Sequence, residues 1–225
     1  MRIAVNTRLL LPDRLEGIGR FMHESLKILV RDHPEVQWIF IFDRQFHPDL
    51  ALAENVTPVV LPPQARHPIL WTVWFEWMIP YILKKYKADL FLSPDGYNSL
   101  RSKIPSVTVI HDLNFEHNPD DVPGWAGRFL RSNFPKYAKK ATRVATVSEY
   151  SASDIHKTYG IDLNHIDVVY NGVDDRFSQL EVHQQDDVKQ RETDGFPYFL
   201  YVGAINQRKN ISRMLEAFDL FRKKN

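Results

Sequence analysis

Short apolar runs alternate with amphipathic helical stretches along most of the chain. Runs of strand length predict buried strands, and apolar residues three or four positions apart predict helices that pack by one face. The predicted strands cover residues 3–6, 38–42, 59–61, 90–92, 107–111, 144–147, 166–169 and 199–202. The predicted helices cover residues 17–30, 69–87 with a kink or break near Pro80, 127–140 despite Pro135, about 148–159, and 211–221. This alternation predicts an α/β fold, a Rossmann-like, doubly wound and mostly parallel sheet covered on both faces.

The pattern changes at residues 177–195, which are polar and lack periodicity. We interpret residues 177–196 as a linker or surface excursion between a first domain, 1–176, and the start of a second, 197–225. The second piece offers one strand and one helix, which bury too little apolar surface for a core of their own. We therefore interpret the chain as a fragment of a longer protein. Packing of this piece against the first domain is the alternative.

Composition narrows the class of protein. The 225 residues are 44% hydrophobic and 25% charged, which is typical of a soluble globular chain. A net charge of +1 argues against bulk nucleic-acid binding, and the lack of cysteine excludes disulfides and thiolate zinc sites. Met1 leads directly into a strand, and no apolar run approaches the ~18 residues that span a bilayer. We therefore expect no signal peptide and a cytoplasmic location.

One segment near the end of the chain combines a strand, a loop, two cations and a helix start. The apolar run 199–202 ends at Gly203, and the following loop carries Arg208 and Lys209. Asn210 then stands as a favourable N-cap residue before the last helix. Backbone N–H groups and the helix dipole attract anions at such a position, and the cations add charge. The segment therefore predicts a phosphate site.

A second candidate for phosphate binding lies at the start of the first predicted helix, where Gly17, Gly19 and Arg20 follow one another closely. Two glycines let the backbone approach a ligand, and the helix N-terminus favours a phosphate. A flexible loop that leads into a helix cap is the alternative, and the spacing alone does not decide between the two.

His111 and Asp112 end the predicted strand 107–111 and would therefore lie at the carboxyl edge of the sheet, where doubly wound proteins bind ligands. A histidine there can donate a hydrogen bond or act as an acid or base near neutral pH. We treat both residues as catalytic candidates. The alternative is a histidine that ends a strand and is satisfied by backbone groups. No nucleophile accompanies the pair, so no triad is inferred.

Three more residues are candidates for the same cleft. Ser148 and Glu149 begin a predicted helix, and their first role is to cap it. Asn171 precedes Gly172 in a predicted tight turn, whose first explanation is turn chemistry.

Two surface features bear on partners. The Trp-rich stretch 71–77 is interpreted as core and domain surface, and lysines follow it at 84, 85 and 87. A second basic cluster lies within residues 136–143. Solvated helix faces explain both clusters, and peripheral contact with anionic lipid is the alternative.

Five segments occur in an order that carries a resemblance. They are residues 17–20, 111–113, 146–151, 169–174 and 201–210. Together they resemble the retaining, nucleotide-sugar-dependent glycosyltransferases of the family called glycosyl transferases group 1, which have the GT-B fold. The match extends over almost the whole chain and says little about the sugar.

The resemblance implies two Rossmann-like domains that face each other across a cleft, the N-terminal one for the acceptor and the C-terminal one for the donor. Gly17 and Gly19 would lie near the donor phosphates, and His111 would contact the donor sugar. Arg208 and Lys209 would neutralise the departing diphosphate. The implied reaction is hexose transfer with retention from a GDP-mannose or UDP-hexose class donor to a glycan or lipid-linked acceptor in cell-surface polysaccharide synthesis.

No Asp-x-Asp motif is present, so no metal and no other cofactor is expected. Membrane contact, if made, would be peripheral, at the inner face. Two positions depart from the family pattern, because Glu16 and Ala204 replace a glycine and an arginine. The family's Glu-x7-Glu segment would lie beyond Asn225 with the missing part of the C-terminal domain, so we expect this chain alone to transfer little or no sugar. A nucleotide-sugar epimerase and a non-catalytic nucleotide-phosphate-binding module are the alternatives.

Overall fold

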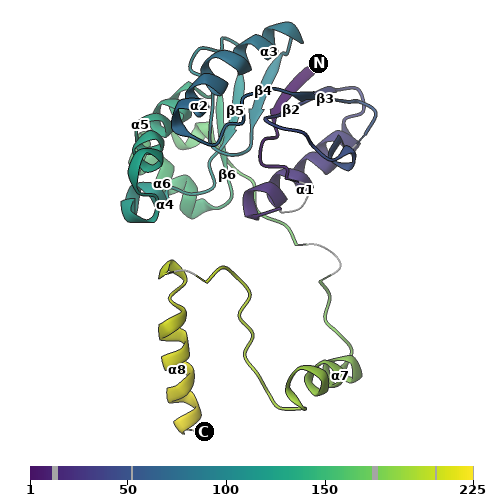
Figure 1. Cartoon of the computed structure of the whole chain (residues 1–225), viewed down its shortest axis with the longest axis vertical. Coiled ribbons are helices and arrows are strands. Elements are labelled where there is room, and N and C mark those ends of the chain that lie inside the picture. Colours follow the sequence, from purple (N-terminus) through teal and green to yellow (C-terminus); the bar gives the residue numbers. More distant parts are fainter. Residues whose placement is uncertain (12–14, 52, 174–176, 206, 225) are drawn as a thin grey trace. The chain divides into compact units, whose positions relative to one another are not determined.

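The computed structural model describes residues 1–11, 15–51, 53–173, 177–205 and 207–224 (Figure 1). The chain divides into two units, Met1–Gly172 and Val173–Asn225, and each is described by itself. The predicted domain boundary at residue 176 and Asp174 of the predicted motif 169–174 lie outside the described residues.

The first unit contains one seven-stranded sheet in which all neighbouring strands are parallel. Its strands are β1 (Arg2–Asn6), β2 (Gln37–Phe42), β3 (Val56–Val60), β4 (Leu90–Ser93), β5 (Ser106–Val109), β6 (Arg143–Thr146) and β7 (Ile166–Val168), in the order β3-β2-β1-β4-β5-β6-β7. The predicted α/β, Rossmann-like fold is therefore confirmed. The order reverses between β1 and β4, because the chain builds outward from β1 to β3 and then returns to add β4 on the other side of β1.

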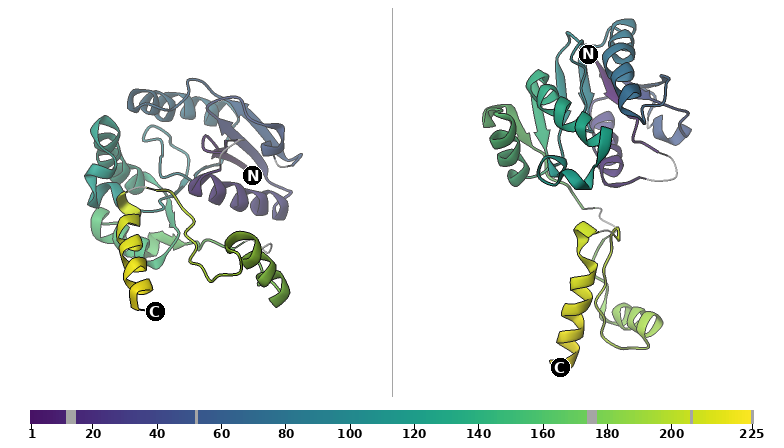
Figure 2. Two further views of the ribbon diagram at one scale, coloured as in Figure 1. Left: turned by 60° about the horizontal axis from the view of Figure 1, so that its bottom comes forward. Right: turned by 60° about the vertical axis from the view of Figure 1, so that its left-hand side comes forward.

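Helices cover both faces of this sheet (Figures 1 and 2). They are α1 (Gly17–Asp32), α2 (Pro68–Val73), a π-helical turn η2 (Trp74–Met78), α3 (Ile79–Lys85), α4 (Asn114–His117), α5 (Gly124–Lys140) and α6 (Glu149–Tyr159), with short 3-10 turns η1 (Pro48–Ala51), η3 (Pro119–Asp121) and η4 (Leu163–His165). The alternation along β1 assigns the faces, since Ile3 and Val5 pack in the core of α1 and Ala4 packs in the core of α3, α5 and α6.

A kink or a break was predicted near Pro80, and of the two the break is wrong, because the helix runs on from Pro68 to Lys85. Proline has no N–H to give to the helix and its ring crowds the preceding turn. The π-helical turn just before it supplies the extra room, since the Ile79 N–H donates to the Trp74 carbonyl five residues back. Pro135 likewise lies inside a continuous helix, α5, as predicted.

Two strand limits differ from prediction by more than one residue. The third strand begins at Val56 rather than at residue 59. The fifth ends at Val109, so His111 lies two residues beyond it, in the connection that follows the sheet edge.

The second unit contains two helices, α7 (Val182–Thr193) and α8 (Ile211–Lys224), and a 3-10 turn η5 (Gln207–Lys209). The last predicted helix is confirmed. The polar stretch interpreted as a linker or surface excursion contains α7, a helix that was not predicted and that begins with a capping box between Glu181 and Gln184. The predicted strand 199–202 is wrong: these residues are exposed, and the described residues 177–205 and 207–224 contain no strand with which they could pair.

No helix among the described residues has both the length and the apolar character to cross a bilayer.

Candidate functional site

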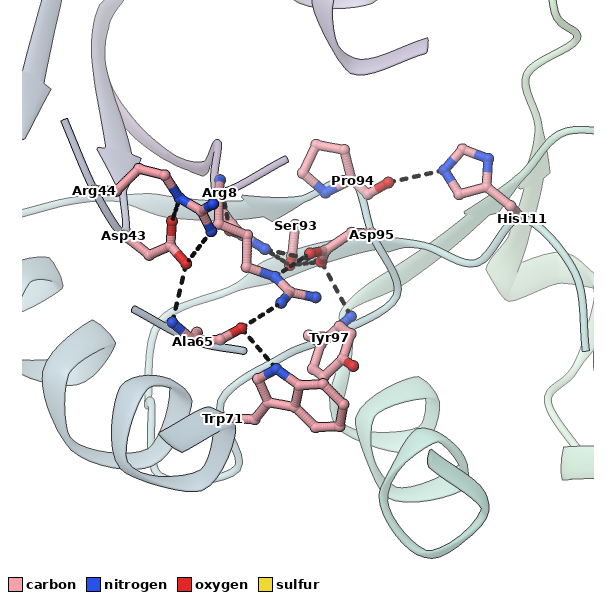
Figure 3. Close-up of polar contacts among 11 residues, drawn as sticks. Arg8, Asp43, Arg44, Ala65, Trp71, Ser93, Pro94, Asp95, Tyr97 and His111 are labelled. Carbon is pink, nitrogen blue, oxygen red and sulfur yellow. Dashed lines mark hydrogen bonds and ion pairs between the residues drawn. The ribbon is translucent and has the colours of Figure 1, made fainter. Parts of the chain in front are cut away.

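Polar side chains follow three neighbouring strands at their carboxyl ends (Figure 3). Asn6 is the last residue of β1 and Arg8 lies two residues beyond it, Asp43 follows β2, and Ser93 and Asp95 lie at the end of β4 and two residues beyond it. This edge includes the point where the strand order reverses, and doubly wound folds bind ligands in the crevice outside such a point. The sequence therefore places polar chemistry where the topology leaves room for a ligand.

An ion pair between Arg8 and Asp95 lies at the centre of this region. The Arg8 Nε to Asp95 Oδ2 distance is 2.6 Å, and the two side chains are only 9% and 1% exposed. The guanidinium also donates to the Ala65 carbonyl at 3.1 Å and lies over the Tyr97 ring, 4.2 Å from its centroid. Burial alone would lower the pKa of Arg8, but the charge of Asp95 and its hydrogen bond outweigh burial and raise it. The Arg8 guanidinium therefore keeps its charge in the folded protein.

Asp95 is fully occupied by its neighbours. Its Oδ1 accepts hydrogen bonds from Asn6 Nδ2 at 2.8 Å and from Ser93 Oγ at 3.2 Å, while Oδ2 accepts from Arg8. A buried carboxylate is tolerable only when it is paired and hydrogen-bonded in this way. These bonds hold Asp95, and with it the loop after β4, in place.

The Ala65 backbone ties a third loop to the same cluster. Its N–H donates to Asp43 Oδ2 at 2.9 Å, and Arg44 Nε donates to Oδ1 of the same carboxylate at 2.6 Å. The Ala65 carbonyl accepts hydrogen bonds from the Arg8 guanidinium and, at 2.7 Å, from Trp71 Nε1 of α2. These bonds connect the ends of β1 and β2 to the helix that precedes β4.

Burial also raises the pKa of Tyr97 to about 12, with a smaller opposing effect of the Arg8 charge. The phenol is therefore neutral at physiological pH, and its ring provides the apolar platform under the guanidinium.

His111 lies where three parts of the first unit meet. Its Nε2 is 2.8 Å from the Pro94 carbonyl in the loop after β4, and its ring packs edge-on against Phe21 of α1 at a centroid distance of 4.9 Å. Its own carbonyl accepts from Ser151 Oγ of α6 at 3.1 Å. A carbonyl can only accept, so the ring proton lies on Nε2 and the neutral ring has its lone pair on Nδ1. A backbone carbonyl therefore orients the ring, as in the alternative given from the sequence, a histidine that is satisfied by backbone groups.

Asp112 takes a different position. Its side chain is exposed, and Oδ1 accepts from the Asn114 N–H at 2.9 Å at the start of α4. This is a local cap, and the structure describes no hydrogen bond between Asp112 and His111. The catalytic role of Asp112 stays a prediction.

The two glycines of α1 differ in their surroundings. A Cβ on Gly19 would lie 2.7 Å from the Leu9 carbonyl oxygen, whereas a Cβ on Gly17 would meet nothing within 4 Å. Packing against the chain after β1 therefore explains Gly19 without a ligand. Gly17 and Arg20 are exposed at the helix start, and their proposed phosphate contacts stay predictions.

The remaining candidates lie on two units. Ser148 caps α6 as expected, accepting from the Ser151 N–H at 3.1 Å, and Glu149 accepts from the Tyr170 hydroxyl at 3.2 Å. Asn171 is exposed after β7. Arg208 and Lys209 are exposed in η5 of the second unit, and their role also stays a prediction.

A shallow recess of about 450 Å³ lies at the opposite, amino-terminal edge of the sheet. It is lined by Met1, Arg2, Glu35, Gln37, Lys87 and Asp89. None of these residues is a predicted site residue, and the chemistry gathers at the other edge.

Sequence reasoning missed Asn6, Arg8, Asp95 and Tyr97. The signal was available in part, because polar residues follow directly on the apolar strands β1 and β4. The segment 93–96 was interpreted only as a turn. The pairing of Arg8 with Asp95 joins residues 87 positions apart and has no local signature.

The fold is a Rossmann-like parallel sheet, and its polar side chains gather at the carboxyl edge where the strand order reverses. Residues 15–177 match the family described as Glycosyltransferase Family 4, and the chain belongs to that family. The predicted resemblance to the glycosyltransferases is therefore confirmed as family membership.

Relatives and solved structures agree with this assignment. The chain is 27% identical over 150 residues to the O-antigen chain mannosyltransferase RfbU of Salmonella typhimurium, covering 66% of this chain and 38% of that protein. It is similar in fold to Anabaena Alr3699/HepE, solved with UDP and glucose, at a TM-score of 0.54 and 13% identity, covering 87% of this chain and 51% of that one. It is also similar to WaaG, a glycosyltransferase of lipopolysaccharide biosynthesis, at a TM-score of 0.55 and 16% identity, covering 85% and 51%. The chain thus spans well under two thirds of each.

Proposed function

We propose that this chain is the acceptor-side half of a retaining glycosyltransferase that transfers a hexose from a nucleoside-diphosphate sugar to a glycan or lipid-linked acceptor in cell-surface polysaccharide synthesis. The single observation that carries the proposal is the position of His111. The chain belongs to Glycosyltransferase Family 4. His111 lies beyond the carboxyl end of its strand β5, and its Nε2 is hydrogen-bonded to the Pro94 carbonyl.

The proposed chemistry requires stabilisation of a leaving diphosphate more than a protein nucleophile. In this proposal, His111 contacts the donor sugar through its second ring nitrogen, and the helix start at Gly17 and Gly19 lies near the phosphates. Arg208 and Lys209 neutralise the departing charge. The buried Arg8–Asp95 pair positions the loop that orients His111.

A GDP-mannose donor is favoured because RfbU is named a mannosyltransferase, and UDP-hexose is the alternative because Alr3699/HepE was solved with UDP and glucose. The proposal includes turnover without metal, a location at the cytoplasmic face of the membrane, and peripheral contact with that membrane. It also includes little or no transfer by residues 1–225 alone, since the chain covers only 38% of RfbU.

The test uses the full-length protein and measures nucleotide binding by calorimetry and sugar transfer to a lipid-linked acceptor, each with and without EDTA. GDP, UDP and their mannose and glucose sugars are the ligands. His111→Ala should abolish transfer, whereas His33→Ala, an exposed histidine after the end of α1, should leave it unchanged. Lys209→Ala should weaken nucleotide binding.

Three outcomes would overturn the proposal. Nucleotide binding without transfer would favour a binding module, and interconversion of the free nucleotide sugar would favour an epimerase. A product of inverted anomeric configuration would refute retention.

A further inference from the structure

One face of the helix α2–η2–α3 exposes a row of apolar side chains that the described residues of the first unit leave uncovered. Its members are Ile69, Val73, Trp77 and Tyr81, with exposed fractions of 58%, 36%, 59% and 58%. We call them the exposed row. Trp74, Phe75 and Ile79, on the other side of the same helix, are fully buried. The Trp-rich stretch of the sequence therefore divides into a core side and a surface side.

The π-helical turn explains how the four residues of the exposed row come to share one face of the helix. In a regular helix of about 3.6 residues per turn, positions four apart drift steadily around the axis. The wider turn at residues 74–78 holds more residues per turn and offsets this drift between Val73 and Tyr81. Four positions spaced four apart therefore lie on one face, and π-helical turns of this kind are frequent at functional sites.

Cations border the exposed row. The Arg101 guanidinium lies over the Trp77 ring, 3.7 Å from its centroid. Lys84 and Lys85, both exposed, follow Tyr81 by three and four positions and therefore continue the same face. Lys103 is exposed in the loop that carries Arg101.

Acidic residues are almost absent here. Glu76 is the only acid between residues 66 and 88, and its carboxylate accepts from the backbone N–H groups of Leu100 and Arg101, both at 3.1 Å. These two bonds fasten the loop beside the helix, so that Arg101 can stack on Trp77. The face therefore combines exposed apolar side chains with a net positive charge.

We propose that the exposed row, with Arg101, Lys84 and Lys85, docks on the surface of an anionic lipid bilayer. Trp and Tyr favour the membrane–water interface, and Lys and Arg at its border extend their charged ends to lipid phosphates while their stems stay on apolar surface. Anionic headgroups supply the negative charge that this face lacks. A protein partner would have to provide an apolar groove lined by acidic side chains, which is a more specific requirement than the surface of an anionic bilayer.

The start of this helix also contacts the candidate site. Trp71 of α2 donates to the Ala65 carbonyl, which in turn accepts from Arg8. A bilayer held by the exposed row would therefore lie against the element that borders the carboxyl edge of the sheet. This inference rests on the proposed function only for the acceptor, which would be a lipid-linked molecule in that bilayer.

The experiment measures co-sedimentation of the full-length protein with vesicles of phosphatidylcholine alone and of phosphatidylcholine with 30 mol% phosphatidylglycerol. We expect binding to the anionic vesicles that weakens as salt rises. The double substitution Trp77→Ser/Tyr81→Ser should reduce binding at least tenfold. Lys84→Ala/Lys85→Ala should reduce it roughly 25-fold, since each lysine near an anionic surface contributes about fivefold, or ~1 kcal/mol.

Matched controls lie elsewhere on the first unit. Tyr150→Ser removes an aromatic ring that is 79% exposed on α6, and Lys139→Ala/Lys140→Ala neutralises the second basic cluster at the end of α5. Neither should change vesicle binding. Circular dichroism and nucleotide binding of every variant show whether it is folded.

The outcomes separate this inference from the proposed function. Equal vesicle binding by all variants, or loss of binding in the controls alone, would overturn it. A change of oligomeric state in Trp77→Ser/Tyr81→Ser without a change in vesicle binding would show that a second copy covers the row, and would also overturn it. Row-dependent vesicle binding without sugar transfer would support the docking surface and count against the transferase.

Discussion

Replacing Asp95 by asparagine tests the buried ion pair most directly. The substitution keeps the shape of the side chain, removes its charge and leaves one acceptor oxygen in place of two, so the buried Arg8 guanidinium loses its counter-ion. Breaking a buried pair by removing one charge costs about 3–5 kcal/mol. The hydrogen bonds from Arg8 and Asn6 are both charge-assisted, each contributes about 1.5–3 kcal/mol, and the single amide oxygen can keep only one of the two.

Arg143 and Asp167 provide the matched comparison. They also form an arginine–carboxylate pair, with Nε to Oδ2 at 2.9 Å, but their side chains are 40% and 50% exposed. Exposed pairs contribute about 0–1 kcal/mol, so Asp167→Asn should cost no more than that. The two substitutions are chemically identical and differ in the burial of the pair. The loss of unfolding free energy should therefore be at least ~2 kcal/mol larger for Asp95→Asn than for Asp167→Asn, and this difference measures the effect of burial.

The assay is urea denaturation followed by tryptophan fluorescence. All five tryptophans lie within residues 1–172, so the signal reports on the first unit. If Asp95→Asn does not fold, Arg8→Lys keeps the charge, loses the fork geometry and should cost a smaller amount. Equal midpoints for Asp95→Asn and Asp167→Asn would refute the reasoning, because they would mean that burial of the pair has no energetic consequence.

Three further predictions follow from the geometry of the first unit. Gly19→Ala should destabilise by about 1–3 kcal/mol because its Cβ meets the Leu9 carbonyl, whereas Gly17→Ala should be neutral or slightly stabilising; equal thermal midpoints would contradict this. Because burial raises the pKa of Tyr97 to about 12 from about 10 in the unfolded chain, its contribution to stability is complete below pH 10 and is lost between pH 10 and 12. Tyr97→Phe should flatten the fall in unfolding free energy over that range, and an unchanged slope would argue against it. Nitrogen NMR of the neutral His111 ring should find the proton on Nε2, as the Pro94 carbonyl requires, and a proton on Nδ1 would disprove that contact.

Much of the fold was predictable because its signals are local. Strands β1 and β2 read as apolar runs, and α1 repeats apolar residues at helical spacing, so the period alone located them. The cap of α6 by Ser148 was predictable for the same reason. A parallel sheet followed from the alternation of the two patterns.

The errors have physical causes. A strand needs a neighbour, so the apolar run 199–202 does not form one by composition alone. The helix α7 is polar on all sides, and only its capping box marks it, so a search for apolar periodicity passes over it.

The candidate site was only partly predictable. His111 was found because it ends an apolar run, but its contact with the Pro94 carbonyl joins segments that are distant in the sequence. Arg8 and Asp95 form the most buried ion pair described, yet each looks locally like an ordinary polar residue after a strand.

The contacts at Ala65 bear on how this site can change over time. Both of its hydrogen-bonding groups belong to the main chain, so the three loops are joined without any demand on side-chain chemistry at that position beyond small size. Loop residues on either side are then free to vary while the frame around Arg8 and His111 keeps its form. A protein built in this way can acquire a new ligand preference by exchanging a few loop side chains, without first having to rebuild its scaffold.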